Sequence, residues 1–359
     1  MFLDHSPPEI YTYTIPLCKH TRHRKRFIVK NLLLILFFLL FNILSCNTLQ
    51  AKSKTVVFIR YPIPVSHFST VLTGFKETME KHGFHEGKQI EYIDVLTSTA
   101  DKASVPEVIK AIENWQDKAD MIITSGWVSM YARKELQKTD TPQLFVPVLE
   151  SVALTMLPST TTPPKTNLSG LYLMYPPEKI VRLVHLLLPR LMHYAYVYDS
   201  QIPADMIFKS AYEQLSVAKQ HDITIHFIDL ATGVKQVLQD LANKNIEAFG
   251  GIIGSFQKRK ELAVSGLPVI TSFTLDIEQE ELESYVEEGN MLAGLFNPFR
   301  YCGEQAAEMT AEIFNGTKNI KQTIPRPAKQ IAFINFKTAN KLKIQVPFTA
   351  LESVDIVIK

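Results

Sequence analysis

The chain has 359 residues, 46% of them hydrophobic and 21% charged, a balance typical of a folded protein rather than a disordered one. Its 38 Lys and Arg residues nearly match 36 Asp and Glu residues, so the net charge of +2 gives no indication of a nucleic-acid-binding surface. Three cysteines are too few for a disulfide framework. Core burial therefore has to hold the fold together.

The N-terminal segment has the order of an export signal, with basic residues, then the apolar run 32–41, then the small residue Ser45 before Cys46. The apolar run is shorter than the roughly 20 residues of a membrane span, so we expect a cleaved signal rather than a permanent anchor. The basic residues are Lys19, Arg22, Arg24, Lys25, Arg26 and Lys30.

Cys46 closes the apolar run and resembles the cysteine of a bacterial lipobox, which takes a lipid and becomes the mature N-terminus. The alternative is an ordinary cleavage site near Ala51. We expect residues 1–51 to be a signal peptide and tether. The mature protein would then work in the periplasm or cell envelope, attached to a membrane through a lipid on Cys46.

After the signal, short apolar runs alternate with amphipathic stretches of helical period. Such alternation predicts an α/β fold with parallel sheets, because parallel strands need crossover connections. The pattern restarts after the Pro- and Thr-rich segment 158–167, so we expect two consecutive halves.

In chain order, the first half predicts strands at 55–59, 90–95, 121–124 and 143–148, with helices at 68–82, 105–115 and 128–136 between them. The second half opens with an extended segment at 168–173 and predicts helices at 178–188, 206–221, 234–244 and 258–265, and strands at 193–198, 223–228, 249–253 and 268–270. A strand at 291–295, a helix at 303–315 and a tail of extended and helical segments at 331–335, 338–342 and 354–358 complete the chain.

Three segments carry a resemblance to a known family. Gly74-Phe75-Lys76-Glu77 with residues 82–88, and Leu168-Ser169-Gly170 with Leu188-Pro189, are two of them. The most specific is Ile334-Asn335-Phe336-Lys337-Thr338-Ala339 with Val346-Pro347 and Asp355. From about Thr55 onward the chain resembles the substrate-binding proteins of bacterial ABC transporters, in the type I periplasmic-binding branch that includes tryptophan- and tyrosine-binding lipoproteins.

The resemblance implies a clamshell of two doubly wound parallel-sheet lobes joined by a multi-segment hinge. We expect an N-terminal lobe at 52–168 plus about 296–328 and a C-terminal lobe at 169–295 plus about 329–359. The crossings should lie near 168–172, 291–299 and 329–335. A ligand that bridges the lobes would shift an open-closed equilibrium.

The implied partners are a small-molecule solute, an ABC permease and its ATPase subunit. We expect a monomer that uses no cofactor or metal and binds no nucleic acid.

In the first half, candidate ligand contacts follow strands, where helix N-termini and free amides favour anionic groups. Trp127 would stack on an aromatic ligand or fill a lobe interface, and Glu150 would hold an ammonium group or be a surface carboxylate. The serines would contact the ligand or cap helices, and the histidine would be a contact or solvated. The candidates are Ser66, His67, Ser69, Ser125, Gly126, Trp127, Glu150 and Ser151.

In the second half, two expected turns carry Ser-Phe pairs where related proteins often place an Asp. This departure leaves an amino-acid ligand less certain and favours a less cationic or more aromatic one. Asn297 would contact the ligand or pack in the hinge. The candidates are Ser255, Phe256, Ser272, Phe273 and Asn297.

Enzyme signatures are weak. Gly250-Gly251 and Gly254 lack the Lys of a phosphate-binding loop, no Gly-x-Ser-x-Gly or His-Glu-x-x-His occurs, and the histidines are scattered and expected to be solvated. We therefore expect a non-enzymatic solute-binding protein of an ABC importer, with an aromatic amino acid or related carboxylate as the ligand.

Two alternatives use the same fold. One is a clamshell sensor or scavenging lipoprotein without a transport partner. The other is a repressor's ligand domain, which the export signal and the lack of an N-terminal helix-turn-helix oppose.

The lipobox resemblance makes a direct prediction about the mature N-terminus. We expect mass spectrometry of the membrane fraction to find a lipidated N-terminal Cys46. A mature protein that begins elsewhere, such as at Lys52, would support the ordinary signal instead.

Overall fold

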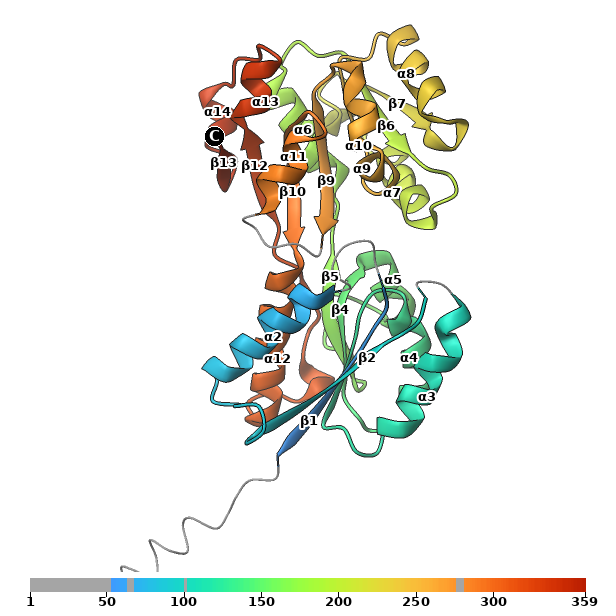
Figure 1. Ribbon diagram of the computed structural model, residues 1–359, viewed down its shortest axis with the longest axis vertical. Coiled ribbons are helices and arrows are strands. Elements are labelled where there is room, and N and C mark those ends of the chain that lie inside the picture. Colours follow the sequence, from blue (N-terminus) through green and yellow to red (C-terminus); the bar gives the residue numbers. More distant parts are fainter. Residues whose placement is uncertain (1–52, 63–67, 100–101, 276–280) are drawn as a thin grey trace, which may run out of the picture. The chain divides into compact units, whose positions relative to one another are not determined.

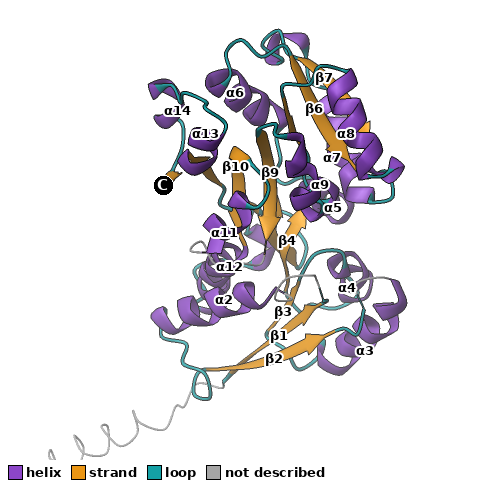
Figure 2. Cartoon of the chain, turned by 45° about the horizontal axis from the view of Figure 1, so that its top comes forward, coloured by secondary structure: helices purple, strands orange, loops and turns teal. Residues whose placement is uncertain are grey.

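The computed structural model describes residues 53–62, 68–99, 102–275 and 281–359. The expected signal and tether, Cys46 included, lie outside the described residues. In the described part of the chain the strands form two sheets (Figure 1). Helices cover both faces of each sheet (Figure 2), as the alternation of strands and helices predicted.

The first sheet, sheet A, has the strand order β11-β5-β4-β3-β1-β2, and its described pairings are all parallel. Its strands are β1 (Lys54–Arg60), β2 (Ile90–Leu96), β3 (Met121–Thr124), β4 (Gln143–Leu149), β5 (Leu168–Leu173) and β11 (Arg326–Pro327). The helices of this first lobe are α2 (Ser69–Lys81), α3 (Val105–Trp115), α4 (Val128–Leu136), α5 (Glu150–Met156) and α12 (Phe299–Phe314).

The second sheet, sheet B, has the order β13-β12-β10-β9-β8-β6-β7, in which the pairing of β10 with β12 is antiparallel and the other pairings are parallel. Its strands are β6 (His193–Tyr198), β7 (Thr224–Asp229), β8 (Ala248–Gly250), β9 (Val269–Leu275), β10 (Met291–Pro298), β12 (Ile331–Asn335) and β13 (Ile356–Ile358). The helices of this second lobe are α6 (Pro177–Leu187), α7 (Pro203–Glu213), α8 (Val234–Asn243), α9 (Gly254–Gln257), α10 (Arg259–Leu262), α11 (Leu282–Glu287), α13 (Phe336–Lys341) and α14 (Phe348–Leu351).

Strand β1 is apolar and buried at residues 56–59 because helices cover both of its faces. Phe58 points to one face and packs edge-on against Phe75 of α2, with the ring centroids 5.0 Å apart. Its neighbour Ile59 points to the other face, into a core that contains Ile112 of α3. Successive side chains of a strand point to opposite faces, so a strand covered on both sides reads as a continuous apolar run.

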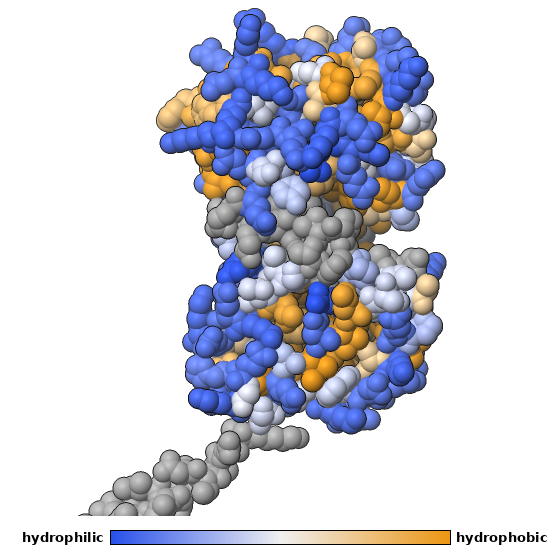
Figure 3. Space-filling view, in the orientation of Figure 1, coloured by the Kyte–Doolittle hydropathy of each residue, from blue (hydrophilic) through white to orange (hydrophobic). Residues whose placement is uncertain are grey.

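Helix α2 shows the complementary pattern of one buried face. Phe75 and Met79, four residues apart, are fully buried, whereas Glu80 and Lys81 are exposed. The surface over this helix is mainly hydrophilic (Figure 3). The helical period seen in the sequence therefore gives the face that packs on sheet A.

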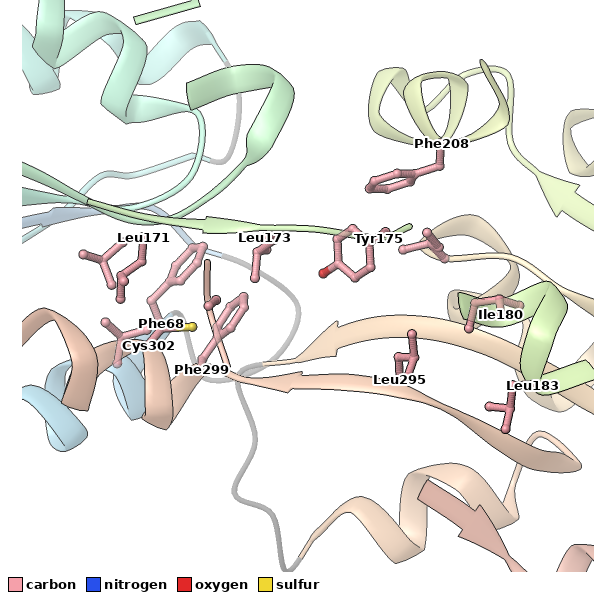
Figure 4. Close-up of a cluster of buried hydrophobic side chains, with 14 of the residues drawn as sticks. Phe68, Leu171, Leu173, Tyr175, Ile180, Leu183, Phe208, Leu295, Phe299 and Cys302 are labelled. Atoms are coloured by element: carbon pink, nitrogen blue, oxygen red, sulfur yellow. The ribbon is translucent and has the colours of Figure 1, made fainter. Parts of the chain in front are cut away.

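Three segments connect the two lobes: residues 174–176 after β5, the junction of β10 with α12, and residues 328–330 between β11 and β12. At the second crossing, Phe299 stacks on Phe68 with ring centroids 5.1 Å apart (Figure 4). Since β5 pairs with β4, residues 168–173 belong to sheet A and the first crossing follows Leu173. With that shift, we retain the expected division into lobes as a proposal.

Most expected elements begin and end within three residues of their observed bounds, but three differ by more. The helix expected at 303–315 begins four residues earlier, at Phe299. The helix expected at 206–221 ends at Glu213, and a short 3₁₀ turn follows at Val217–Lys219. There the side-chain amide of Gln220 donates to the carbonyl of Leu215 at 2.8 Å, which closes the chain into a compact turn. The strand expected at 268–270 continues to Leu275, because β10 pairs with it over its whole length.

Helices α2 and α12 approach closely through two glycines. A Cβ on Gly74 would lie 2.4 Å from the carbonyl oxygen of Arg300, and one on Gly303 would lie 2.0 Å from the carbonyl oxygen of Val71. Both distances are far below normal van der Waals contact. The family-like Gly74-Phe75 sequence is thus needed for helix packing.

This close contact predicts whether a substitution of Gly303 raises or lowers the stability of the protein. Ala for Gly in a helix interior normally stabilises by about 1 kcal/mol, but Gly303→Ala should destabilise this protein by about 1–3 kcal/mol because the methyl group overpacks the contact. Urea unfolding measures the difference. Glu308→Ala, at an exposed position of α12, is the control and should stay within about 0.5 kcal/mol of the parent. A Gly303→Ala protein as stable as the parent would contradict the close approach.

Candidate ligand-binding site

The first-lobe candidates lie at one edge of sheet A. Strands β1, β3 and β4 are neighbours in the order β4-β3-β1 and run parallel, so their carboxyl ends share an edge. Ser69 begins α2, which follows β1, and Glu150 begins α5, which follows β4. Ser66 and His67 lie outside the described residues. The other candidates at this edge are Ser125, Gly126, Trp127 and Ser151.

Tyr61, which the sequence analysis missed, organises the aromatic part of this edge. Its ring lies 5.1 Å from that of Phe68 and 5.3 Å from that of Trp127, and Trp127 in turn packs edge-on against Tyr131 at 5.4 Å. Burial raises the pKa of Tyr61 to about 12, and a hydrogen bond from the backbone of Trp127 to its hydroxyl opposes that rise. The sequence feature that could have identified Tyr61 is an aromatic residue directly after the first strand.

Gly126 is the residue that this arrangement requires. Its φ is +55°, and a Cβ there would lie 2.4 Å from the hydroxyl oxygen of Tyr61. Any other residue would both strain the backbone and push the tyrosine away. The glycine therefore allows Tyr61 to reach the Trp127 amide.

The amides of this turn already have partners inside the protein. The N–H of Ser125 donates to the carbonyl of Ile59 at 3.1 Å, and that of Gly126 donates to the carbonyl of Pro147 at 3.0 Å. With the Trp127 amide bound to Tyr61, the turn does not present these three donors to an anion. Of the features expected to bind an anionic group, free amides in this turn and a helix N-terminus, only the helix N-terminus remains.

Trp127 and Ser151 keep polar groups without a hydrogen-bond partner at this edge, among the described residues. The indole N–H of Trp127 is buried without a hydrogen-bond partner among the described residues, while its ring packs within the first lobe. The carboxylate of Glu150 accepts a hydrogen bond from the hydroxyl of Thr160 at 3.3 Å. Ser151 has a buried hydroxyl that lacks a partner within the described chain.

The second-lobe candidates are not brought together as a site. Phe256 is buried and stacks on Phe273 at 5.1 Å, and the guanidinium of Arg259 lies 4.7 Å from its ring centroid. Ser255 lies in α9, just beyond the carboxyl end of β8. Both phenylalanines therefore contribute to the core of the second lobe.

The turn expected at Ser272 and Phe273 is wrong, because both residues lie inside β9 and are almost fully buried. Phe273 packs between Phe296 and Phe333, at centroid distances of 5.3 and 5.8 Å. The sequence that follows β9 begins Asp276-Ile-Glu278, so the acidic residues that seemed to be lost come after Leu275. They lie outside the described residues.

Asn297 lies in the hinge. It is 1% exposed, and its amide nitrogen donates to the carbonyl of Lys329 at 2.9 Å, which links the second crossing to the third. The amide N–H of Asn297 is thus used within the hinge, and a ligand contact through this residue stays a prediction.

Asp205, at the start of α7, is a second residue that the sequence analysis missed. Its fully buried carboxylate accepts hydrogen bonds from the amides of Asp199, Ile253 and Gly254, at 3.1, 3.0 and 2.9 Å. Burial raises its pKa, and the three amides oppose that rise. Asp205 ties the end of β6 to the turn after β8, at the carboxyl edge of sheet B.

The histidines expected to be scattered are partly paired. Nδ1 of His193 and Nε2 of His226 lie 3.1 Å apart, and His185 stacks on His221 at 4.8 Å. Over the described ranges, no group of three or more His, Cys, Asp or Glu side chains is arranged to hold a metal ion. In the same part of the chain, no helix is long and apolar enough to cross a membrane.

The His193–His226 pair predicts acid sensitivity. Burial, then His193 and Lys244, lower the pKa of His226 below its ordinary value of about 6.5. The unfolded chain then binds the proton more tightly, so this contribution to stability is present above about pH 6.5 and is lost as the pH falls. In urea unfolding at about pH 7.5 and about pH 5, His226→Gln should lose less stability than the parent. His221→Gln, in the stacked pair, is the control, and equal losses in all three proteins would reject the assignment.

The two mostly parallel sheets and the three crossings define a two-lobed binding protein of the type I periplasmic class. The family model for ABC transporter substrate binding protein matches residues 59–358. The chain therefore belongs to the ABC transporter substrate-binding protein family. Its members are extracytoplasmic, non-enzymatic components that work with a small-molecule ligand and an ABC transporter.

Solved structures show the same fold at low sequence identity. A ligand-free, open substrate-binding protein with adhesive properties from Clostridium difficile has a TM-score of 0.67 and 18% identity, over 86% of this chain and 100% of that one. An ABC domain in complex with L-Trp from Streptococcus pneumonia has a TM-score of 0.63 and 15% identity over the same shares. A conserved domain protein from Vibrio cholerae has a TM-score of 0.63 and 21% identity, over 86% of this chain and 99% of that one. No curated protein matches the chain.

Proposed function

We propose that this chain is the solute-binding component of an ABC importer, which takes up an aromatic amino acid or a related small solute and delivers it to a permease. The observation that carries the ligand class is the cluster of Tyr61, Phe68 and Trp127 at the carboxyl edge of sheet A, beside Glu150 on the neighbouring strand end. The aromatic faces suit a flat apolar ligand body. The carboxylate suits an ammonium group.

The proposed contacts are residues at this edge and, from the second lobe, Ser255 after β8. They are Ser69, Ser125, Gly126, Trp127, Glu150 and Ser151. Because three amides of the turn at Ser125–Trp127 are bound within the protein, the ammonium and the ring contribute most of the recognition, and a ligand carboxylate contributes less.

The proposed cycle uses the hinge. A ligand held by both lobes would favour the closed state by the difference between its affinities for the closed and open states. The protein would be exported, monomeric and anchored through Cys46, so that the bound form meets the permease at the membrane. A clamshell sensor or scavenging lipoprotein is the alternative, and a permease and an ATPase encoded beside this chain would distinguish the importer from it.

Calorimetric titration tests the ligand class with three related compounds: phenylalanine, phenethylamine and 3-phenylpropionate. We expect the two ammonium compounds to bind. Glu150→Gln should weaken both by about 10- to 100-fold, since a charge-assisted hydrogen bond contributes roughly 1.5–3 kcal/mol. It should leave 3-phenylpropionate nearly unchanged.

Glu135→Gln, which removes a half-buried carboxylate on α4 that pairs with Lys138, is the matched control. Equal affinities in the parent and Glu150→Gln would remove Glu150 from the site. If no aromatic amino acid or amine binds the parent protein, the proposed ligand class is wrong.

A further inference from the structure

A cavity of about 370 Å³ lies in the second lobe, between α6 and the C-terminal segment over sheet B. It falls in the size range of small-molecule sites, roughly 300–1,000 Å³. None of its lining residues belongs to the strand ends of the candidate ligand site. It is therefore separate from the site proposed above.

The charges at the cavity favour an anion. Lys179 and Arg182 lie three residues apart on α6, which puts them on the same side of the helix. Arg182 forms no ion pair with any described residue, and the ammonium of Lys179 lies 3.5 Å from the side-chain oxygen of Gln330. The carboxylate in the lining, Asp355, already accepts a hydrogen bond from the amide of Ala332 at 2.7 Å. The lining thus holds two cations and one carboxylate, and the carboxylate is already bound to the backbone.

The rest of the lining is apolar except for Ser353. Leu183 of α6 and Leu295 of β10 are nearly buried (Figure 4 labels both), and Leu186 and Ala332 belong to the same lining. Cations beside apolar side chains match a ligand with one charged end and a short hydrocarbon body. A bare inorganic ion would leave the leucines without a partner.

Gln330 connects this cavity to the hinge. It lies on the third crossing, and its amide nitrogen donates to the carbonyl of Met174 on the first crossing at 3.2 Å. The same nitrogen lies 3.4 Å from Oδ1 of Asn297, near the second crossing. Through its oxygen it contacts Lys179, so an anion that engages Lys179 changes the surroundings of a side chain that touches all three crossings.

We propose that this cavity is a second binding site, which takes a small organic carboxylate with an apolar body and acts on the hinge through Gln330. Binding to the cavity stands independently of the proposed transport function. The effect on the hinge rests on the proposed transport function, because the hinge sets ligand affinity only in a binding protein that opens and closes. Any such coupling is reciprocal between the two sites.

Fluorine NMR of the full chain with 4-(trifluoromethyl)benzoate as the probe tests the site. We expect saturable binding, at least about tenfold weaker binding of the neutral 4-(trifluoromethyl)benzamide, and about tenfold or greater loss of benzoate binding in Arg182→Gln, the effect of one charge-assisted contact. Lys235→Gln removes an exposed cation on α8 and should change nothing. No saturable binding, equal binding of the amide, or equal effects of the two substitutions would overturn the site.

Hydrogen exchange tests the connection to the hinge. Saturating benzoate should change the protection of peptides that cover residues 326–335 in the parent and not in Arg182→Gln. Unchanged protection in the parent, with the probe bound, would overturn the action through Gln330. Neither result depends on the aromatic-ligand titration, so failure of the proposed ligand class is distinguishable from failure of this site.

Discussion

Parallel strand pairing is the constraint on which the rest of this structure depends. Each parallel step needs a crossover helix, so helices cover both faces and the carboxyl ends of β1, β3 and β4 lie at one edge. Tyr61, Trp127 and Glu150 are far apart in sequence and lie at that edge because each follows one of those strands. The strand topology therefore sets where the candidate site lies, and the particular side chains set only its chemistry.

Both lobes use their own polar groups to fix the turns at these edges. In the first lobe the Tyr61 hydroxyl holds the Trp127 amide, and in the second the Asp205 carboxylate holds the amides of Ile253 and Gly254. Such bonds orient the turns before a ligand arrives. They also leave fewer amides for an anionic ligand, so specificity depends more on rings and on Glu150 than the resemblance alone suggests.

The hinge is the second place where distant segments meet. Asn297 and Gln330 join the three crossings by side-chain hydrogen bonds, and Phe299 stacks on Phe68 where α12 begins. The hinge thus combines side-chain hydrogen bonds with apolar contacts that belong to the main buried cluster. A small number of hydrogen bonds is the kind of element whose balance a ligand can shift, because each is worth about 1 kcal/mol.

The sequence by itself determined the α/β class, the two halves, and most strands and helices, since apolar period and Gly or Pro boundaries are local signals. It also placed Trp127 and Glu150 directly after strands. Tertiary structure decided the remainder. Strand β9 extends to Leu275 because β10 pairs with it, and Phe273 is core because Phe296 and Phe333 surround it. Asp205 is buried because amides about 50 residues away supply its hydrogen bonds. Those partners are distant in sequence, and no local pattern records them.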